Sequence, residues 1–210
     1  FNSFPNQSDT RLQNLFITID IDIANAHPCI LSQLCSKNNW PSPKLQDYVN
    51  NREFYLQSVM DRCIVTRNQA KELFLRLSYG GTFVKWMRDE LIDFSDISKH
   101  PPHFVAEFER ELRTLRNLIV QKYPDVFEVA KGNRIKQNKT TLSIKASCMS
   151  LVLQKIEHTI MMKIAEFFRI RDWQIGVYIF DGIMIYKSES NTAALETSTF
   201  NECQQYVLDE

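Results

Sequence analysis

The chain has 210 residues, 44% of them hydrophobic, which is enough for one globular domain or a compact pair of subdomains and excludes disorder for most of it. Its 25 basic residues balance 25 acidic ones, so any phosphate-binding surface must come from local clustering. The five cysteines include no Cys-x-x-Cys pair and predict free thiols in a reducing compartment.

Neither a bilayer-spanning apolar stretch of ~20 residues nor a signal peptide is recognisable in the sequence. We therefore expect an intracellular, non-secreted protein with no membrane partner. The chain starts without Met and ends abruptly, which leads us to expect a domain of a larger protein.

The N-terminal part predicts a lead-in, a strand and a helix. Residues 1–14 are polar and show little periodicity. The β-branched and aromatic run 15–22 predicts a strand that places Asp20 and Asp22 on the same face. Pro28 suits the first position of the helix that follows.

For one helix in the middle of the chain, the sequence predicts both ends. Thr66 and Gln69 form a capping-box pattern, so the helix is expected to begin at Arg67. The pair Gly80-Gly81 is expected to end it. Other mostly helical stretches are predicted over 48–65, 82–91, 102–122 and about 142–169, and in the segment from 191.

Two short apolar β runs, 175–180 and 183–187, are joined by Asp181-Gly182, a strong two-residue hairpin signal. Few strands among many helices predict an α+β fold with a small antiparallel sheet. The strand that carries Asp22 is expected to neighbour this hairpin.

Asp22 and Asp181, each at the end of a strand, are candidates to hold two divalent ions. Nucleotide addition to a 3′-hydroxyl is assisted by two such ions, and Mg²⁺ prefers oxygen ligands. The bland interpretation is that Asp22 is an exposed sheet residue and Asp181-Gly182 a turn. For Asp181 taken alone, a turn is the favoured interpretation. When the helix that begins at Arg67 is considered together with Asp22 and Asp181, the metal-binding interpretation is favoured instead.

That helix carries Arg67, Lys71 and Tyr79 on one broad face. Arg and Lys can neutralise the phosphates of a nucleoside triphosphate, and a Tyr ring can stack on a base. The alternative is an ordinary solvated amphipathic helix.

Three segments of the chain, taken in sequence order, resemble the active-site motifs of a known polymerase superfamily. Arg67-x-x-x-Lys71-x-x-x-Leu75-x-x-x-Tyr79-Gly80 is similar to motif B of family A DNA polymerases and single-subunit phage-type RNA polymerases. The run 22–31 looks like motif A and the run 178–185 like motif C, so the resemblance covers about 15–187.

The resemblance implies a template-directed nucleotidyltransferase, a DNA polymerase or primase, with DNA template and primer and nucleoside triphosphates as partners. It implies two Mg²⁺ or Mn²⁺ ions held by Asp22, Asp181 and the carbonyl of Ile23. Lys71 is the third implied catalytic residue. The implied nucleotide-binding residues are Arg67, Lys71, Leu75, Tyr79, Gly80 and His27.

The resemblance also implies a palm and a fingers subdomain within 15–190, with the fingers at about 44–140, followed by a helical segment 191–210 that continues into a larger protein. Within the superfamily the chain most resembles the compact branch of transposons, virophages and other mobile elements, often fused to a helicase. A fused or associated helicase is therefore an expected partner.

Three positions depart from the motifs. His27 stands where family A DNA polymerases carry a sugar-discriminating Glu, so the choice between deoxyribonucleotides and ribonucleotides stays open. Leu75 replaces an aromatic residue or Met, and Gly182 replaces a carboxylate that often follows the motif C Asp. An RNA-synthesising enzyme and a catalytically silent nucleic-acid-binding or helicase-docking domain remain alternatives. A two-metal nuclease would not need the face of Arg67, Lys71 and Tyr79.

A basic run precedes the long helix at about 142–169, and such a run is expected to contact nucleic-acid phosphates unless it is only a solvated loop. Its candidate residues are Lys131, Arg134, Lys136, Lys139 and Lys145.

Overall fold

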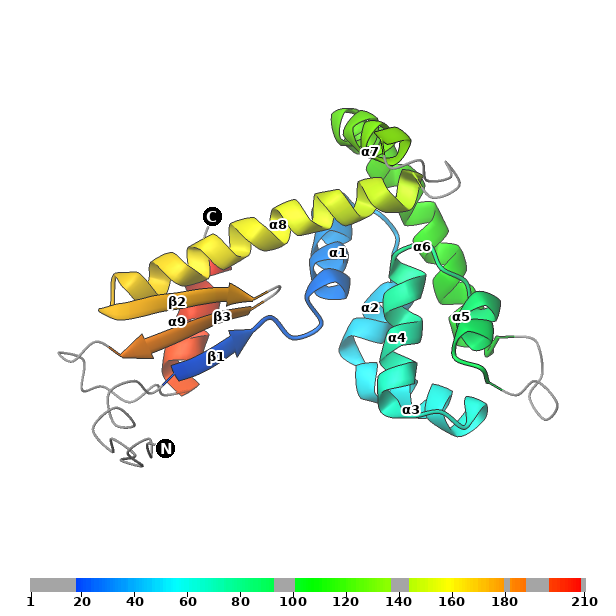
Figure 1. The fold of residues 1–210 in the computed structure, drawn as a ribbon, viewed down its shortest axis with the longest axis horizontal. Coiled ribbons are helices and arrows are strands. Elements are labelled where there is room, and N and C mark those ends of the chain that lie inside the picture. The colour runs from blue at the N-terminus through cyan, green and yellow to red at the C-terminus, as the bar shows by residue number, and fades with distance from the viewer. Residues whose placement is uncertain (1–17, 93–100, 137–143, 180–181, 188–196, 209–210) are drawn as a thin grey trace, which may run out of the picture. The chain divides into compact units, whose positions relative to one another are not determined.

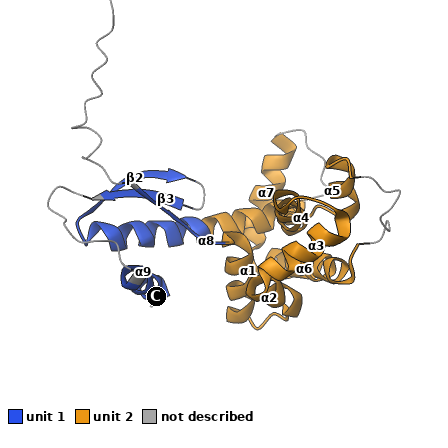
Figure 2. Cartoon of the chain, turned by 90° about the horizontal axis from the view of Figure 1, so that it is seen from below, with its two compact units in different colours: residues 1–24, 157–210 blue, residues 25–156 orange. Residues whose placement is uncertain are grey.

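The computed structural model describes residues 18–92, 101–136, 144–179, 182–187 and 197–208. The chain divides into two compact units, one of residues 1–24 and 157–210 and the other of residues 25–156 (Figure 2). The boundary falls within the long helix α8, Ile144–Arg169. Each unit is described by itself.

Unit 1 is a three-stranded antiparallel sheet with helices against it (Figure 1). Its elements are β1 (Thr18–Asp22), β2 (Trp173–Ile179), β3 (Gly182–Lys187), α9 (Thr197–Leu208) and the C-terminal part of α8. The strand order β1-β3-β2 places β3 in the middle. The predicted α+β class and the small antiparallel sheet are confirmed.

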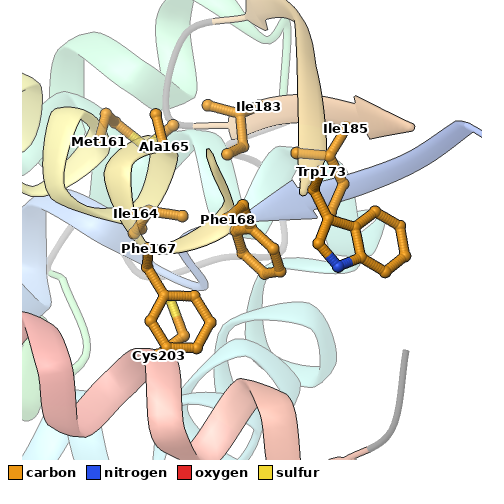
Figure 3. Packing of buried hydrophobic residues seen from close by; sticks show 9 residues of the cluster. All are labelled: Met161, Ile164, Ala165, Phe167, Phe168, Trp173, Ile183, Ile185 and Cys203. Carbon is orange, nitrogen blue, oxygen red and sulfur yellow. The ribbon is translucent and has the colours of Figure 1, made fainter. Parts of the chain in front are cut away.

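The core of unit 1 lies between the sheet, α8 and α9 (Figure 3). Ile183 and Ile185 of β3 are buried there, and Ile19 and Ile21 of β1 pack against the same cluster. Because strand side chains alternate between faces, Asp20 and Asp22 share the other face and are exposed, as predicted. The remaining buried members are Met161, Ile164, Ala165, Phe167, Phe168, Trp173 and Cys203.

Unit 2 is helical. Its helices are α1 (Ala26–Lys37), α2 (Pro43–Asn50), α3 (Arg52–Cys63), α4 (Arg67–Ser78), α5 (Phe83–Asp89), α6 (His103–Lys122), α7 (Pro124–Lys136) and the first part of α8. Aromatic rings join its core: Tyr48 of α2 stacks on Phe74 of α4 with ring centroids 4.3 Å apart, and Phe108 of α6 contacts both. Among the described residues no helix is long and apolar enough to cross a membrane.

Some local details differ from the predictions. The mostly helical character of 48–65 is confirmed, and the stretch holds the end of α2 and all of α3, two helices that meet at Asn51. Helix α1 begins at Ala26, so Pro28 occupies its third position. Proline is tolerated there because the first four N–H groups of a helix have no partner within it. No helix was predicted for the basic run, which had a solvated loop as its alternative, and Lys131, Arg134 and Lys136 belong to α7.

The hairpin also differs from its prediction. Ile179 pairs with Gly182, so Gly182 is the first residue of β3 and does not form the turn. Asp181 lies outside the described residues. The predicted division into palm and fingers, with fingers at about 44–140, stays a prediction.

Candidate active site

Helix α4 has the ends that the sequence predicts. The Thr66 hydroxyl accepts from the Gln69 N–H, and the Gln69 side chain accepts from the Thr66 N–H at 2.9 Å. At the other end the Gly81 N–H donates to the Arg76 carbonyl at 2.8 Å and the Gly80 N–H to the Leu77 carbonyl at 3.1 Å. This is a Schellman motif, which requires the left-handed φ of 80° that Gly80 adopts. The length and register of α4 are therefore fixed locally.

The predicted nucleotide-binding face of α4 is its outer face. Leu73 and Phe74 are buried on the opposite side, together with Leu77. Arg67 is exposed, and Leu75, a leucine in the middle of the helix, is 46% exposed. Leu75 lies between Lys71 and Tyr79 along this face, where it would offer a ligand an apolar contact.

A carboxylate of α3 holds Arg67. The guanidinium donates twice to Glu53, with N···O distances of 2.6 and 3.2 Å, in a bidentate ion pair. The hydrogen bond from Arg67 lowers the pKa of Glu53, with smaller contributions from Arg52 and Lys71. Three cations thus surround one carboxylate, which leaves a positive surface. Glu53 was not predicted from the sequence, because no local pattern indicates an ion-pair partner on a different helix.

Tyr79 and His27 lie together although they are 52 residues apart. The Tyr79 hydroxyl and His27 Nδ1 form a hydrogen bond, and the two rings meet edge to face with centroids 5.6 Å apart. Both side chains are half-buried. The structure therefore brings together His27 and Tyr79, two of the residues that were predicted to bind the nucleotide.

A cleft of about 440 Å³ opens beside the C-terminal end of α4, against α5. Arg76 fixes α5 there: it donates to Asp89 at 2.7 Å and to Glu90 at 3.3 Å. Leu75 and Tyr79 line this cleft, so both reach open space rather than the core.

Asp22 lies at the end of β1, directly opposite Gly182. The contact is close: a Cβ atom placed on Gly182 would collide with Asp22 Oδ1 and would lie 3.1 Å from the Ile21 carbonyl oxygen. Gly182 therefore makes room for the Asp22 carboxylate, a role that a turn signal does not reveal. Asp22 is exposed and available to a cation, and Ile23 follows it in a segment without regular structure.

The predicted partner Asp181 precedes Gly182 in sequence and lies outside the described residues, so its distance from Asp22 is not tested. Among the residues that are described, no group of three His, Cys, Asp or Glu side chains forms a metal site. The predicted ligand set differs from such a group, because it consists of two carboxylates and a backbone carbonyl. The donor chemistry suits Mg²⁺, which takes few protein ligands and keeps several waters.

The predicted nucleic-acid contacts are dispersed. Lys131 pairs with Glu128 at 3.4 Å within α7, and Arg134 donates to Ser147 at 2.9 Å. Lys136 is exposed at the end of α7. Lys139 lies outside the described residues. Lys145, in the first turn of α8, is exposed and donates to Asn117 at 2.7 Å.

No protein-family model matches the chain. A protein of Sputnik virophage, described as "Putative helicase V13", is 32% identical to it over 194 residues. The match covers 92% of this chain and 23% of the virophage protein. The chain is thus a distant homologue of one part of that protein.

Proposed function

We propose that the chain is a template-directed nucleotidyltransferase, a DNA polymerase or primase that adds nucleotides to a 3′-hydroxyl. The observation that carries the proposal is the outer face of α4, where Arg67, Lys71, Leu75 and Tyr79 follow one another and Tyr79 meets His27. A solvated amphipathic helix does not by itself account for the histidine from α1 that meets Tyr79 at the end of this row.

Each side chain of this face has a role that its chemistry suits. Arg67 and Lys71 bind the triphosphate, Arg67 after exchanging Glu53 for phosphate oxygens. Leu75 packs on the nucleotide. Tyr79 lies beside the nascent base pair and is held in orientation by His27. His27 is therefore the position that decides between the two sugars.

Asp22, Asp181 and the Ile23 carbonyl would hold the two metal ions, Mg²⁺ or Mn²⁺. Such ions stabilise the charge that develops on the attacking and leaving oxygens of phosphoryl transfer. The protein's own contribution is to place Asp22 at the end of β1, opposite Gly182, where no side chain competes with its carboxylate.

The homologue supports a role in nucleic-acid replication, since its description is that of a helicase. The chain itself has no Gly-x-x-x-x-Gly-Lys-Ser/Thr sequence, the phosphate-binding loop of P-loop ATPases. We therefore propose that this segment supplies synthesis and that a helicase, fused or associated, is its partner.

The test is nucleotide incorporation on a single-stranded DNA template, with and without primer, in Mg²⁺ or Mn²⁺. Asp22→Ala and Asp181→Ala should each abolish product while the proteins stay folded by circular dichroism. Asp20→Ala is the matched control, since Asp20 is exposed on the same strand face and has no proposed role. Activity that survives both active-site changes would refute the mechanism.

The same assay separates the remaining alternatives. Incorporation of ribonucleotides in preference to deoxyribonucleotides identifies an RNA-synthesising primase, and His27→Glu should then shift the ratio toward deoxyribonucleotides. A wild-type protein that binds template but makes no product under any condition identifies a silent nucleic-acid-binding or helicase-docking module.

A further inference from the structure

A second cleft in unit 2, also about 440 Å³, lies where the end of α4 meets α6, α7 and the start of α8. Arg113 and Arg116 of α6 line it together with Lys145 of α8 and the backbone of Gly80 and Gly81. Glu109 is the carboxylate residue that lines this cleft. Three cations face one acid in a confined space, whereas the whole chain is neutral. This is the local clustering of charge that a balanced composition conceals.

The central cation of the cleft is buried. Arg116 keeps only 9% of its surface exposed, and its Nη1 donates to the Leu77 carbonyl at 3.2 Å, in the last turn of α4. Among the residues that the structure describes, no carboxylate forms an ion pair with Arg116, because Glu109 pairs with Arg113 at 3.4 Å. Burial lowers the pKa of Arg116 and the neighbouring charge of Arg113 adds to this effect. The guanidinium remains charged nevertheless.

A buried cation without a carboxylate is costly unless another group compensates it. The partial negative charge at the C-terminus of α4 compensates part of this cost. That explains why Arg116 is tolerated, but not why Arg113 and Lys145 converge on the same space. An anion in the cleft would compensate all three.

The lining of the cleft suits a nucleic-acid strand. Gly80 brings α4 close to α8, since a Cβ atom on it would lie 2.9 Å from the Ala146 Cβ. The half-buried ring of Phe127 adds an aromatic surface to the lining. Cations along a groove with an aromatic ring are the features by which proteins bind single-stranded nucleic acid without sequence preference.

We propose that this cleft binds the phosphate backbone of a single nucleic-acid strand, with Arg113, Arg116 and Lys145 as the contacts. The site shares Lys145 with the sequence prediction but relies on α6 in place of the basic end of α7. Within the proposed function, on which this assignment rests for its biological role, the strand is the template.

The test is fluorescence anisotropy of a labelled 20-nucleotide oligo(dT) with the intact chain, over a range of salt concentrations. Arg113→Gln combined with Lys145→Gln removes two exposed cations and spares the buried Arg116. Each lost phosphate contact reduces the steepness of log affinity against log salt by about 0.7. For the double variant we therefore expect a slope shallower by about 1.4 and binding about 25-fold weaker at about 0.1 M salt. Arg110→Gln, an exposed charge on α6 that does not line the cleft, is the control and should change neither.

Unchanged affinity and slope in the double variant would overturn the assignment. An unchanged affinity for oligo(dT) with a raised KM for nucleoside triphosphates would also overturn it, because the cleft would then bind free nucleotides. Since the binding assay needs no catalysis, it separates this site from the proposed function. If the wild type makes no product but loses oligonucleotide affinity in the double variant, the strand site stands and the polymerase assignment fails.

Discussion

The replacement Gly182→Ala should disable the active site without unfolding the sheet. The added Cβ would occupy the position of Asp22 Oδ1 and would lie 3.2 Å from Asp22 Cγ. Gly182 has no positive φ, so alanine fits its backbone. Since Asp22 is exposed, its side chain can rotate away into water.

The expected cost in stability is small because two effects oppose each other. Forcing Asp22 off its rotamer costs about 0.5–1.5 kcal/mol, and replacing Gly by Ala in a strand returns about 0.5–1 kcal/mol. The net change in the free energy of unfolding is therefore within about 1 kcal/mol. A misplacement of about 1 Å in a catalytic group, in contrast, costs about 100-fold in rate.

The assay is steady-state incorporation as a function of Mg²⁺ concentration, with urea unfolding in parallel. Gly182→Ala should lose about 100-fold in rate and need more Mg²⁺ for half-maximal activity. Gly176→Ala is the control in the same sheet: its Cβ would meet the Tyr186 ring at 3.0 Å, far along a side chain that can move. A folded Gly182→Ala protein with wild-type activity would refute the reasoning, as would an equal loss in Gly176→Ala.

Three further changes test other parts of the structure. Glu53→Gln releases Arg67 from its ion pair and should lower the KM for nucleoside triphosphates with little change in kcat. The control Glu128→Gln, which breaks an ion pair on α7, should leave the KM unchanged. An unchanged KM in both variants would show that the Glu53–Arg67 pair does not affect triphosphate binding. Phe108→Ala removes a buried ring that contacts three others and should cost about 3–5 kcal/mol in urea unfolding, and a cost below about 1 kcal/mol would contradict this packing. Burial raises the pKa of the Cys35 thiol to about 11, so its reaction with a thiol reagent at pH 8 should require unfolding. Because the unfolded thiol ionises near its ordinary pKa of about 8.5, stability should fall as the pH rises from there toward 11, and rapid labelling of native Cys35 would exclude this burial.

Helix α4 was predictable because its signals are local. Thr66 and Gln69 bond to each other's backbone, and Gly80 and Gly81 bond back to the last turn, so each end depends on residues a few positions apart. Its outer face was predictable as well, since helical spacing alone separates Lys71 and its neighbours from the buried side.

Contacts between distant segments were not predictable from pattern. Glu53 reaches Arg67 from another helix, and no spacing rule links them. No helix was predicted for the basic run, yet α7 includes Gly132, and a single Gly costs a helix only about 1 kcal/mol. The bond from Arg134 to Ser147 of α8 contributes to holding the helical form. Tertiary contacts therefore outweighed a local breaker.

The Asp181-Gly182 pair shows why a motif and a turn signal can be confused. From sequence alone, glycine after aspartate is explained by a hairpin turn, and that explanation needs no chemistry. In the structure Gly182 pairs with Ile179 on one side and Asp22 on the other, so it lies in the central strand. With Asp22 in its present rotamer, a side chain at position 182 would collide with the Asp22 carboxylate. The close contact with Asp22 is therefore a second reason for a glycine at this position, one that a turn signal does not provide.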